Sequence, residues 1–200
     1  KNGEYDILLG TQMVAKGLNF PALQLVGIVL ADTALHLPDF RAEERTFALI
    51  TQVAGRAGRF FPDGKVLVQT YNPYSPPIEM AVNGNLETFY KEELTQREIL
   101  NFPPFSRLLR LVFRSSVENA AQTAAFGAKR ILESFKQSEI DILGPAECPL
   151  EKVGAAWRMQ ILLRGKRIEV LQKIASNLIL GYTPPQNVYI EVDVDPQNLL

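Results

Sequence analysis

Apolar residues in the first part of the chain form short runs separated by a helical pattern. The runs 5–9 (YDILL) and 25–30 (LVGIVL) are typical of strands covered on both faces of a parallel sheet, and 65–70 (KVLVQT) predicts a third strand. Between the last two, residues 40–57 carry apolar side chains at helical spacing, and Asp39 is placed to cap the start of that helix. This alternation predicts an α/β domain built on a parallel sheet.

The pattern changes after residue 101. The segment 101–105 (NFPPF) ends the preceding helical stretch because neither proline can donate a backbone hydrogen bond, so we place a domain boundary between residues 101 and 102. Beyond it, alternation predicts strands, and helical spacing predicts helices, in the order 107–113 (strand), 116–135 (helix), 140–143 (strand), 157–163 (strand), 168–181 (helix) and 188–194 (strand). Ser116 is expected to cap the first of these helices, and 144–154 is expected to be a loop. The order β-α-β-β-α-β predicts an α+β, ferredoxin-like second domain.

Composition restricts the classes of protein to which the chain can belong. The 200 residues carry 21 Lys and Arg against 22 Asp and Glu, a formal net charge of −1, which excludes binding to nucleic acid through bulk positive charge. The apolar runs are too short for a transmembrane helix, and we expect no signal peptide. The single cysteine, Cys148, excludes an internal disulfide and a cysteine-based zinc site, and no second ligand accompanies His36. Without an initiator Met, the chain is expected to be part of a longer protein.

The segment 52–59 (QVAGRAGR) carries the most specific chemistry. Gln52, Arg56 and Arg59 are spaced i, i+4 and i+7, so a continuing helix places them on one face, and the two glycines leave the neighbouring surface bare. Planar guanidinium groups on a bare surface suit phosphate oxygens, which they bind bidentately. The alternative is a solvated basic helix end followed by a glycine-rich turn. Two further arginines extend the same stripe toward the helix start: Arg41 and Arg45.

A second polar segment, 11–21 (TQMVAKGLNFP), directly follows the first predicted strand. The carboxyl edge of a parallel sheet is where α/β proteins bind their ligands. Thr11, Gln12 and Lys16 would lie there together, beside the flexible Gly17. The alternative is an ordinary helical turn between two strands.

Together these two segments resemble motifs V and VI of superfamily 2 helicases. The segment 52–59 matches the motif VI pattern Q-x-x-G-R-x-G-R at every defined position, and the longer string that begins at 38–45 (PDFRAEER) resembles the replication-restart helicase family more narrowly. Further segments agree with the C-terminal domain of that family: 102–105, 143–145, 157–163 and 193–196. The resemblance implies that residues 1–101 are the C-terminal part of a second RecA-like lobe, and that 102–200 form a domain that binds DNA and partner proteins.

The resemblance also implies roles for single residues. Arg59 would be the arginine finger, Arg56 would contact the γ-phosphate, and Gln52 would link the nucleotide to the cleft between lobes. A finger in the facing lobe makes hydrolysis depend on lobe closure. The motif V residues Thr11, Gln12 and Lys16 would contact the DNA backbone, which positions the strand without reading its sequence.

Two parts of an ATPase are absent from this sequence. It contains no G-x-x-x-x-G-K-[ST] loop and no acidic Mg²⁺-binding motif. In the family, the first lobe and a cysteine-rich zinc segment would lie upstream of Lys1. We therefore expect ATP and Mg²⁺ at a site that the first lobe completes, zinc only in the full-length protein, and no ATP hydrolysis by these 200 residues alone.

One face of the second domain gathers polar residues. If the apolar positions of its strands face the helices, Arg110 and Arg114 share the opposite face with Arg158, Gln160 and Arg164. This surface could bind a phosphate backbone or an acidic peptide. The alternative is a solvated sheet face. The family resemblance implies fork-DNA binding there, and contact between Arg158, Gln160 and the acidic tail of single-stranded DNA-binding protein.

The complete prediction is a piece of an ATP-dependent 3′-to-5′ DNA helicase that binds stalled replication forks and directs primosome assembly and replication restart. Its expected partners are forked and single-stranded DNA, single-stranded DNA-binding protein and primosome proteins, in the bacterial cytoplasm and away from membranes. Two alternatives stay open. One is a non-catalytic docking module with a helicase-like lobe, and the other is a different superfamily 2 DNA or RNA helicase.

Overall fold

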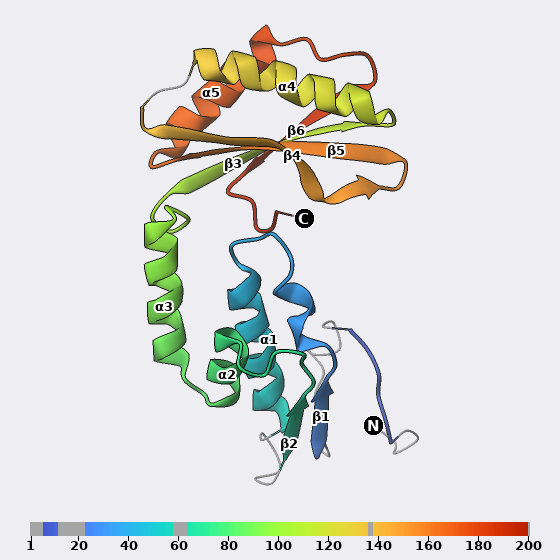
Figure 1. Cartoon of the computed structure of the whole chain (residues 1–200), viewed down its shortest axis with the longest axis vertical. Coiled ribbons are helices and arrows are strands. Elements are labelled where there is room, and N and C mark those ends of the chain that lie inside the picture. Colours follow the sequence, from blue (N-terminus) through green and yellow to red (C-terminus); the bar gives the residue numbers. More distant parts are fainter. Residues whose placement is uncertain (1–5, 12–22, 58–63, 136–137, 200) are drawn as a thin grey trace. The chain divides into compact units, whose positions relative to one another are not determined.

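The chain divides into two compact units, Lys1–Leu94 and Thr95–Leu200. The computed structural model describes residues 6–11, 23–57, 64–135 and 138–199, and Figure 1 traces both units. The observed division between the two units follows Leu94, inside the helix that ends at Ile99. The boundary expected between residues 101 and 102 lies C-terminal to it, just beyond the end of that helix.

The first unit is a small parallel sheet with helices packed against it. Strands β1 (Leu25–Ile28) and β2 (Lys65–Val68) pair in parallel, with Leu25 opposite Lys65 and Ile28 opposite Val68. The helical elements follow in the order η1 (Ala31–Ala34, a 3-10 helix), α1 (Ala42–Ala57), α2 (Pro76–Val82) and α3 (Leu86–Ile99). Helix α1 connects the two strands, and the buried core combines side chains from the sheet and the helices: Ile28, Phe47, Ile50, Val53, Ile78 and Phe89.

The predicted helix over 40–57 is found, with a slightly later start. Asp39 accepts a hydrogen bond from the backbone N–H of Arg41 at 3.0 Å, and its own carbonyl accepts one from Ala42 at 2.9 Å. The helical spacing identified the core side of α1 correctly, because Ile50 and Val53 are buried. Phe47 on this side stacks on Phe89 of α3, with ring centroids 4.0 Å apart and planes 4° from parallel, so the start of α3 packs against α1.

The strand predicted at 5–9 is wrong for the part that is described. Residues 6–9 form no strand, and Ile7, Leu8 and Leu9 are 80%, 59% and 87% exposed. An apolar run becomes a strand only where a neighbouring strand satisfies its backbone groups, and no described segment pairs with this one. The parallel sheet seen among the described residues therefore has two strands instead of the predicted three.

The second unit is a four-stranded antiparallel sheet with two helices on one face (Figure 1). Its elements are β3 (Arg107–Ser115), α4 (Glu118–Ser134), β4 (Ile140–Val153), β5 (Ala156–Gly165), α5 (Ile168–Gly181) and β6 (Val188–Val194). The strand order is β4-β5-β3-β6, and every neighbouring pair is antiparallel. The β-α-β-β-α-β succession predicted from the sequence is thus observed.

The core of the second unit lies between the sheet and its two helices. Leu109, Leu111 and Phe113 of β3 are fully buried there, as the alternation predicted. The helix α4 presents mainly small side chains to the sheet: Ala121, Ala124, Ala125, Ala128 and Leu132. Because alanine extends little beyond the helix backbone, this face lets α4 pack closely on the strands.

Two local predictions fail in this unit. The segment 144–154, expected as a loop, belongs to β4, which pairs with β5 through two register shifts. Gly144 allows the first shift, because its φ is 100° and a Cβ atom there would lie 2.9 Å from the carbonyl oxygen of Gln160. Ser116 does not cap α4. The N-cap residue is Val117, whose N–H donates to Ser115 Oγ at 3.2 Å.

The packing of α4 against Tyr182 predicts an unusual outcome for Gly127→Ala. A glycine inside a helix normally costs about 0.5–1 kcal/mol relative to alanine. Here a Cβ atom would lie 2.6 Å from Tyr182 Oη, which donates to the Ala124 carbonyl at 2.9 Å. We expect Gly127→Ala to lower the thermal midpoint, measured by differential scanning fluorimetry.

A matched control is Gly55→Ala in α1, where nothing lies within 4 Å of the added carbon. We expect this control to leave the midpoint unchanged or raise it. In a Tyr182→Phe background the penalty of Gly127→Ala should shrink, because the closest atom is gone. A stabilising Gly127→Ala would contradict the observed packing of Tyr182 on α4.

Candidate functional site

The first candidate site is the solvent side of α1. Gln52 is exposed, and Gly55 has nothing within 4 Å of the position of a Cβ atom. Val53, on the other side of the helix, is buried. The backbone of Arg56 continues the helix one turn after Gln52, whereas Arg59 lies outside the described residues. The described part of the motif therefore has one side that is buried in the core, at Val53, and one solvent-exposed side, at Gln52 and Gly55.

The start of the same helix has local partners for its arginines. Arg45 Nη1 lies 3.0 Å from Asp39 Oδ2, and the Asp39 side chain is fully buried. The guanidinium carbon of Arg41 lies 4.2 Å from the centroid of the Phe40 ring. These contacts fix the entry to α1.

The ends of β1 and β2 are joined by a carboxylate that sequence reasoning did not identify. Asp32 accepts hydrogen bonds from Thr70 Oγ1 at 2.6 Å and from the N–H of Tyr71 at 2.8 Å. These donors, with a weaker contribution from the Asn72 N–H, lower the pKa of Asp32. Both partners follow the carboxyl end of β2, so Asp32 holds this edge of the sheet together. The position of an aspartate just after an apolar run was the only signal for it.

Of the predicted motif V residues, the structure describes one. Thr11 is exposed and lies in no helix or strand. Gln12 and Lys16 lie outside the described residues, so their predicted contact with a DNA strand stays a prediction.

The second candidate site is the face of the four-stranded sheet opposite α4 and α5 (Figure 1). The register places the five predicted polar residues on this one face, since Val112 lies opposite Gln160, and Arg114 opposite Arg158. The predicted set consists of Arg110, Arg114, Arg158, Gln160 and Arg164. Sharing a face does not make them a bare basic patch, because neighbouring strands supply acceptors.

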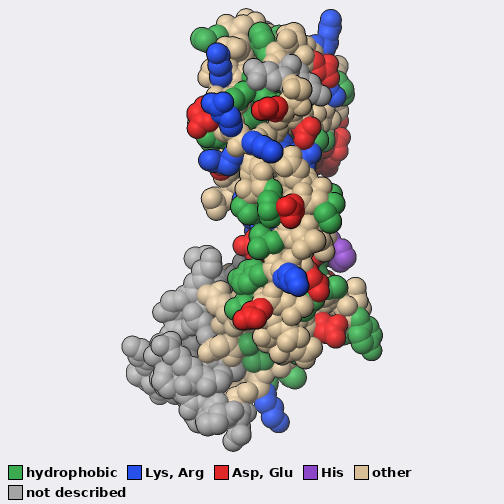
Figure 2. Space-filling model, turned by 90° about the vertical axis from the view of Figure 1, so that its left-hand side faces the viewer, with side chains coloured by type: hydrophobic (Ala, Val, Ile, Leu, Met, Phe, Trp, Pro, Cys, Tyr) green, Lys and Arg blue, Asp and Glu red, His purple; other side chains and the backbone are tan. Residues whose placement is uncertain are grey.

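The outer arginines of this face form ion pairs. Arg114 Nε lies 2.6 Å from Glu191 Oε1 of β6, and its guanidinium lies 5.2 Å from the Tyr189 ring centroid. Arg164 donates to Asp141 Oδ2 at 3.0 Å from Nε and at 2.7 Å from Nη2. Basic and acidic side chains also stand side by side on the flank of the second unit that Figure 2 presents. The Arg114–Glu191 pair is exposed on both sides, and since exposed pairs contribute only about 0–1 kcal/mol, a phosphate could replace Glu191 at small cost. Arg164 is only 16% exposed and also donates to the Leu100 carbonyl at 2.6 Å.

The inner residues of the face form a fixed network instead. Arg110 is 3% exposed, and its Nε donates to Gln160 Oε1 at 2.8 Å. Gln160 Nε2 donates in turn to the Glu147 carbonyl at 3.3 Å. Arg158 makes a longer contact, from Nη1 to the Leu150 carbonyl at 3.5 Å. Arg110 thus positions Gln160, the residue predicted to contact an acidic peptide, and is itself hardly accessible.

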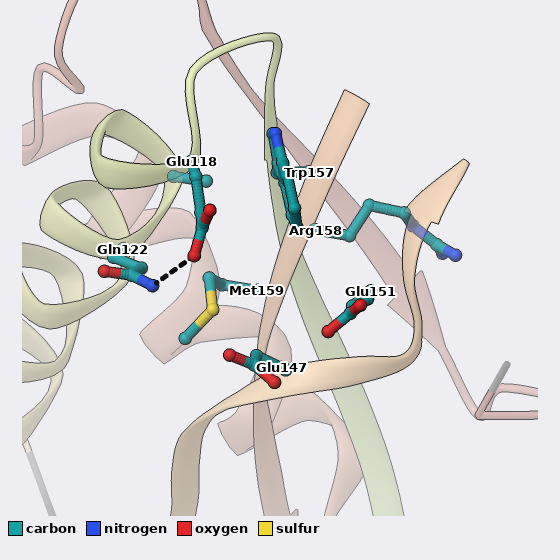
Figure 3. Close-up of a pocket in the computed structure, with 8 residues that line it drawn as sticks. Glu118, Gln122, Glu147, Glu151, Trp157, Arg158 and Met159 are labelled. Atoms are coloured by element: carbon teal, nitrogen blue, oxygen red, sulfur yellow. Dashed lines mark hydrogen bonds between the residues drawn. The ribbon is translucent and has the colours of Figure 1, made fainter. Parts of the chain in front are cut away.

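The second unit has two hollows among the described residues, one at the end of this face and one on the helix side of the sheet. A groove of about 450 Å³ lies at the end of the sheet next to Arg114 and Tyr189, and Ser116 and the β4–β5 turn complete its lining. Its volume falls within the range of about 300–1,000 Å³ that is typical of ligand sites. The second hollow, near the start of α4, holds about 10 Å³, about enough for one water molecule. Figure 3 shows Glu118 and Gln122 of α4 on one side of it, with Trp157 and Met159 of β5 on another.

Cys148 lies under the polar face and is 3% exposed. Burial raises the pKa of its thiol, although the neighbouring Arg110 and Arg158 act in the opposite direction. A thiol with a raised pKa is a poor nucleophile. In the described ranges, no three His, Cys, Asp or Glu side chains gather as a metal ion would require. None of the helices described is both long and apolar enough to cross a membrane.

Comparisons with known proteins identify relatives over nearly the whole length of the chain. The chain is 52% identical over 198 residues to the replication restart protein PriA of Treponema pallidum, covering 99% of this chain and 30% of that protein. It is 38% identical over 200 residues to the PriA of Borreliella burgdorferi, covering 100% of this chain and 30% of that protein. It is 39% identical over 202 residues to the PriA of Bacillus subtilis, covering 99% of this chain and 25% of that protein.

These relatives are much longer than the chain, which spans less than a third of each. The resemblance to replication-restart helicases that the motifs indicated is confirmed by this set of relatives. A family model, described as the primosomal protein N C-terminal domain, matches residues 98–197. That match covers half of the chain and nearly all of the second unit, so the chain belongs to the primosomal protein N C-terminal domain family.

Proposed function

We propose that this chain is the C-terminal part of a replication restart protein, an ATP-dependent 3′-to-5′ DNA helicase that binds stalled forks and directs primosome assembly. The observation that carries the proposal is the complete motif VI at 52–59, with Gln52 and Gly55 on the solvent side of a helix rooted in the core. The names of the relatives, replication restart proteins, support it.

In this proposal the first unit is part of a second RecA-like lobe. The parallel pairing of β1 and β2, with α1 as their connection, supports that assignment. The exposed Gln52 amide and the bare surface at Gly55 suit the approach of a phosphate-bearing ligand. Arg59 would stabilise the charge that develops on the transferred phosphoryl group, and Arg56 would contact the γ-phosphate. Mg²⁺, held by the other lobe, would neutralise charge on the phosphates.

The motif V segment would hold the DNA strand. Thr11, Gln12 and Lys16 offer a hydroxyl, an amide and an ammonium group, which contact phosphate oxygens without reading the bases. Closure and opening of the two lobes around ATP would then move this segment along the strand. A translocating motor needs this kind of sequence-independent contact.

The second unit would bind forked DNA and the acidic tail of single-stranded DNA-binding protein. The exposed Arg114 can exchange its carboxylate partner Glu191 for a phosphate at small cost. Arg164 is mostly buried, and its partner Asp141 is half exposed, so a phosphate would approach it from the side of Asp141. A hydrogen bond from Arg110 fixes the position of the Gln160 side chain, which would contact the acidic tail, and Arg158 lies on the same face. Primosome proteins would be the remaining partners.

The arginine finger has a direct test in the full-length protein. We expect Arg59→Ala to lower DNA-stimulated ATP hydrolysis by about 10³-fold or more, because a missing finger leaves the transition-state charge unbalanced. Nucleotide affinity should change little. Steady-state ATPase assays and titration with a fluorescent nucleotide measure the two quantities.

The matched control is Arg130→Ala, an exposed arginine on α4, which should leave turnover unchanged. If Arg59→Ala hydrolyses ATP at the rate of the unmodified protein, Arg59 takes no part in the reaction. If the unmodified full-length protein shows no ATPase activity, the non-catalytic docking module is the better description.

The bare surface at Gly55 gives a second test that rests on the described helix. Among the described residues nothing lies within 4 Å of the added methyl carbon, so Gly55→Ala should keep or raise the thermal midpoint. We nevertheless expect it to lower DNA-stimulated ATPase activity at least tenfold, because the methyl group would obstruct a ligand or facing lobe. Gly181→Ala, also unobstructed, is the control. Full activity of a stable Gly55→Ala protein would show that nothing approaches this surface.

The polar face of the second unit has a test by salt dependence. The double variant Arg114→Ala, Arg164→Ala should weaken forked-DNA binding and reduce the slope of log K against log salt by about 1–2, as expected for two lost phosphate contacts. Fluorescence anisotropy of the full-length protein from low to moderate salt measures both. Arg130→Ala again serves as the control. An unchanged slope would favour the solvated-face alternative.

A further inference from the structure

The outer edge of β6 is an open strand edge with a distinctive side-chain pattern. We propose that it is a docking site for an extended partner segment in which basic and β-branched residues alternate, which would add to the sheet as a fifth strand. This inference is independent of the helicase assignment, because it uses only the geometry of the second unit. Strand addition of this kind gains affinity from backbone hydrogen bonds and specificity from alternate side chains.

The backbone groups at this edge follow from the pairing of β6 with β3. The N–H of Asp195 donates to the Leu108 carbonyl at 2.8 Å, so the backbone of Asp195 faces β3. In an antiparallel pair this orientation alternates. The backbone groups of Glu191 and Asp193 therefore also face β3, and those of Val192 and Val194 face outward.

The pairing at the other end of β6 agrees with this assignment. The N–H of Val188 turns away from β3 and donates to the Pro185 carbonyl at 3.2 Å. Strand β6 is the last strand of the sheet order, and no described segment pairs with its outer side. The outward N–H and C=O groups of Val192 and Val194 therefore form a ladder that an added strand would complete.

The side chains at this edge define the chemistry of the partner. On the helix side of the sheet, Val192 and Val194 remain 45% and 39% exposed, although this face is otherwise the core. On the opposite face, Glu191 and Asp193 are exposed carboxylates, and Glu191 also pairs with Arg114 of β3. An incoming strand with β-branched residues on one side would cover the valines. Lysine or arginine on its other side would lie opposite the carboxylates.

Charge argues against a second copy of the same strand. Antiparallel self-pairing centred on Val192 places Glu191 opposite Asp193 of the other copy, and pairing centred on Glu191 places two identical carboxylates together. Like charges directly opposite each other destabilise a strand pair. Acidic residues on an edge strand can also have a purely protective role, in which they prevent self-association and bind no partner. The experiment below separates that role from partner binding.

The probe is an acetylated and amidated peptide, Lys-Val-Lys-Val-Lys-Val-Lys, compared with its Glu-Val counterpart. Hydrogen–deuterium exchange of the full-length protein, followed in peptides that cover 188–195, reports on the outward amides. We expect fast exchange at the outward amides of Val192 and Val194 in the free protein. The basic peptide should slow it at least fivefold, and the acidic one should leave it unchanged.

Two variants localise the binding, with the peptide affinity measured by anisotropy. Val192→Pro removes an outward N–H and leaves the pairing with β3 intact, because proline is tolerated on the outer side of an edge strand. It should weaken binding at least tenfold, whereas the control Val192→Thr should stay within about twofold of the unmodified protein. Asp193→Lys should weaken binding of the basic peptide without removing any backbone donor.

The proposal is overturned by any of three results. The first is slow exchange of β6 in the free full-length protein, which would mean that its own upstream part covers the edge. The second is equal binding of the acidic and basic peptides, and the third is no binding of either, which would leave protection against self-association as the role of the carboxylates. The peptide comparison and Asp193→Lys decide the matter even if Val192→Pro fails to fold.

Discussion

The burial of one guanidinium in the middle of the sheet organises the second unit. Strand β3 is covered on both faces, because Leu108 and Val112 are buried on the side opposite the helices, and Arg110 lies between them. A buried charge must keep hydrogen-bond partners, since losing them costs several kcal/mol. Gln160 accepts from the Nε atom of Arg110 and is held in turn by the backbone of β4. The network therefore ties three strands together and fixes the irregular half of β4 against β5.

This constraint divides the polar face into two kinds of residue. The inner ones are positioned and hardly able to move, so they suit recognition of a group with a definite shape. Of the outer ones, the exposed Arg114 holds a partly exposed carboxylate that a competing anion can replace, whereas Arg164 is mostly buried and is held by Asp141 and the Leu100 carbonyl. One sheet face thus combines a rigid centre with an exchangeable ion pair at its rim. The first unit follows a similar logic, with Arg45 fixed by Asp39 at the start of α1 and a bare surface near its end.

The sequence predicted the elements that depend on one periodic pattern. Helical spacing identified the buried side of α1, and alternation identified Leu109, Leu111 and Phe113 as core and Arg110 and Arg114 as sharing the opposite face. It failed where structure depends on distant neighbours. Residues 6–9 are apolar enough for a strand but find no described partner for one, and 144–154 carries turn residues yet pairs with β5 because register shifts accommodate them.

The same limit applies to the candidate sites. The acceptors of Arg114 and Arg164 come from β6 and β4, and only the strand order determines which carboxylate lies beside which arginine. Asp32 was missed for the same reason, because its donors follow a strand that is distant in the sequence. The motif at 52–59, in contrast, is a continuous local string, and it was recognised by its resemblance to a family motif.

The burial of Cys148 has a practical consequence for measuring the conformational dynamics of this protein. Cys148 is the chain's single thiol, it is 3% exposed, and burial raises its pKa. A cysteine placed at an exposed position of these 200 residues would therefore react with a maleimide dye while Cys148 stays unlabelled. Within this part of the molecule, fluorescent pairs or spin labels can be attached without first removing a native residue, and the buried network around Arg110 can be left undisturbed.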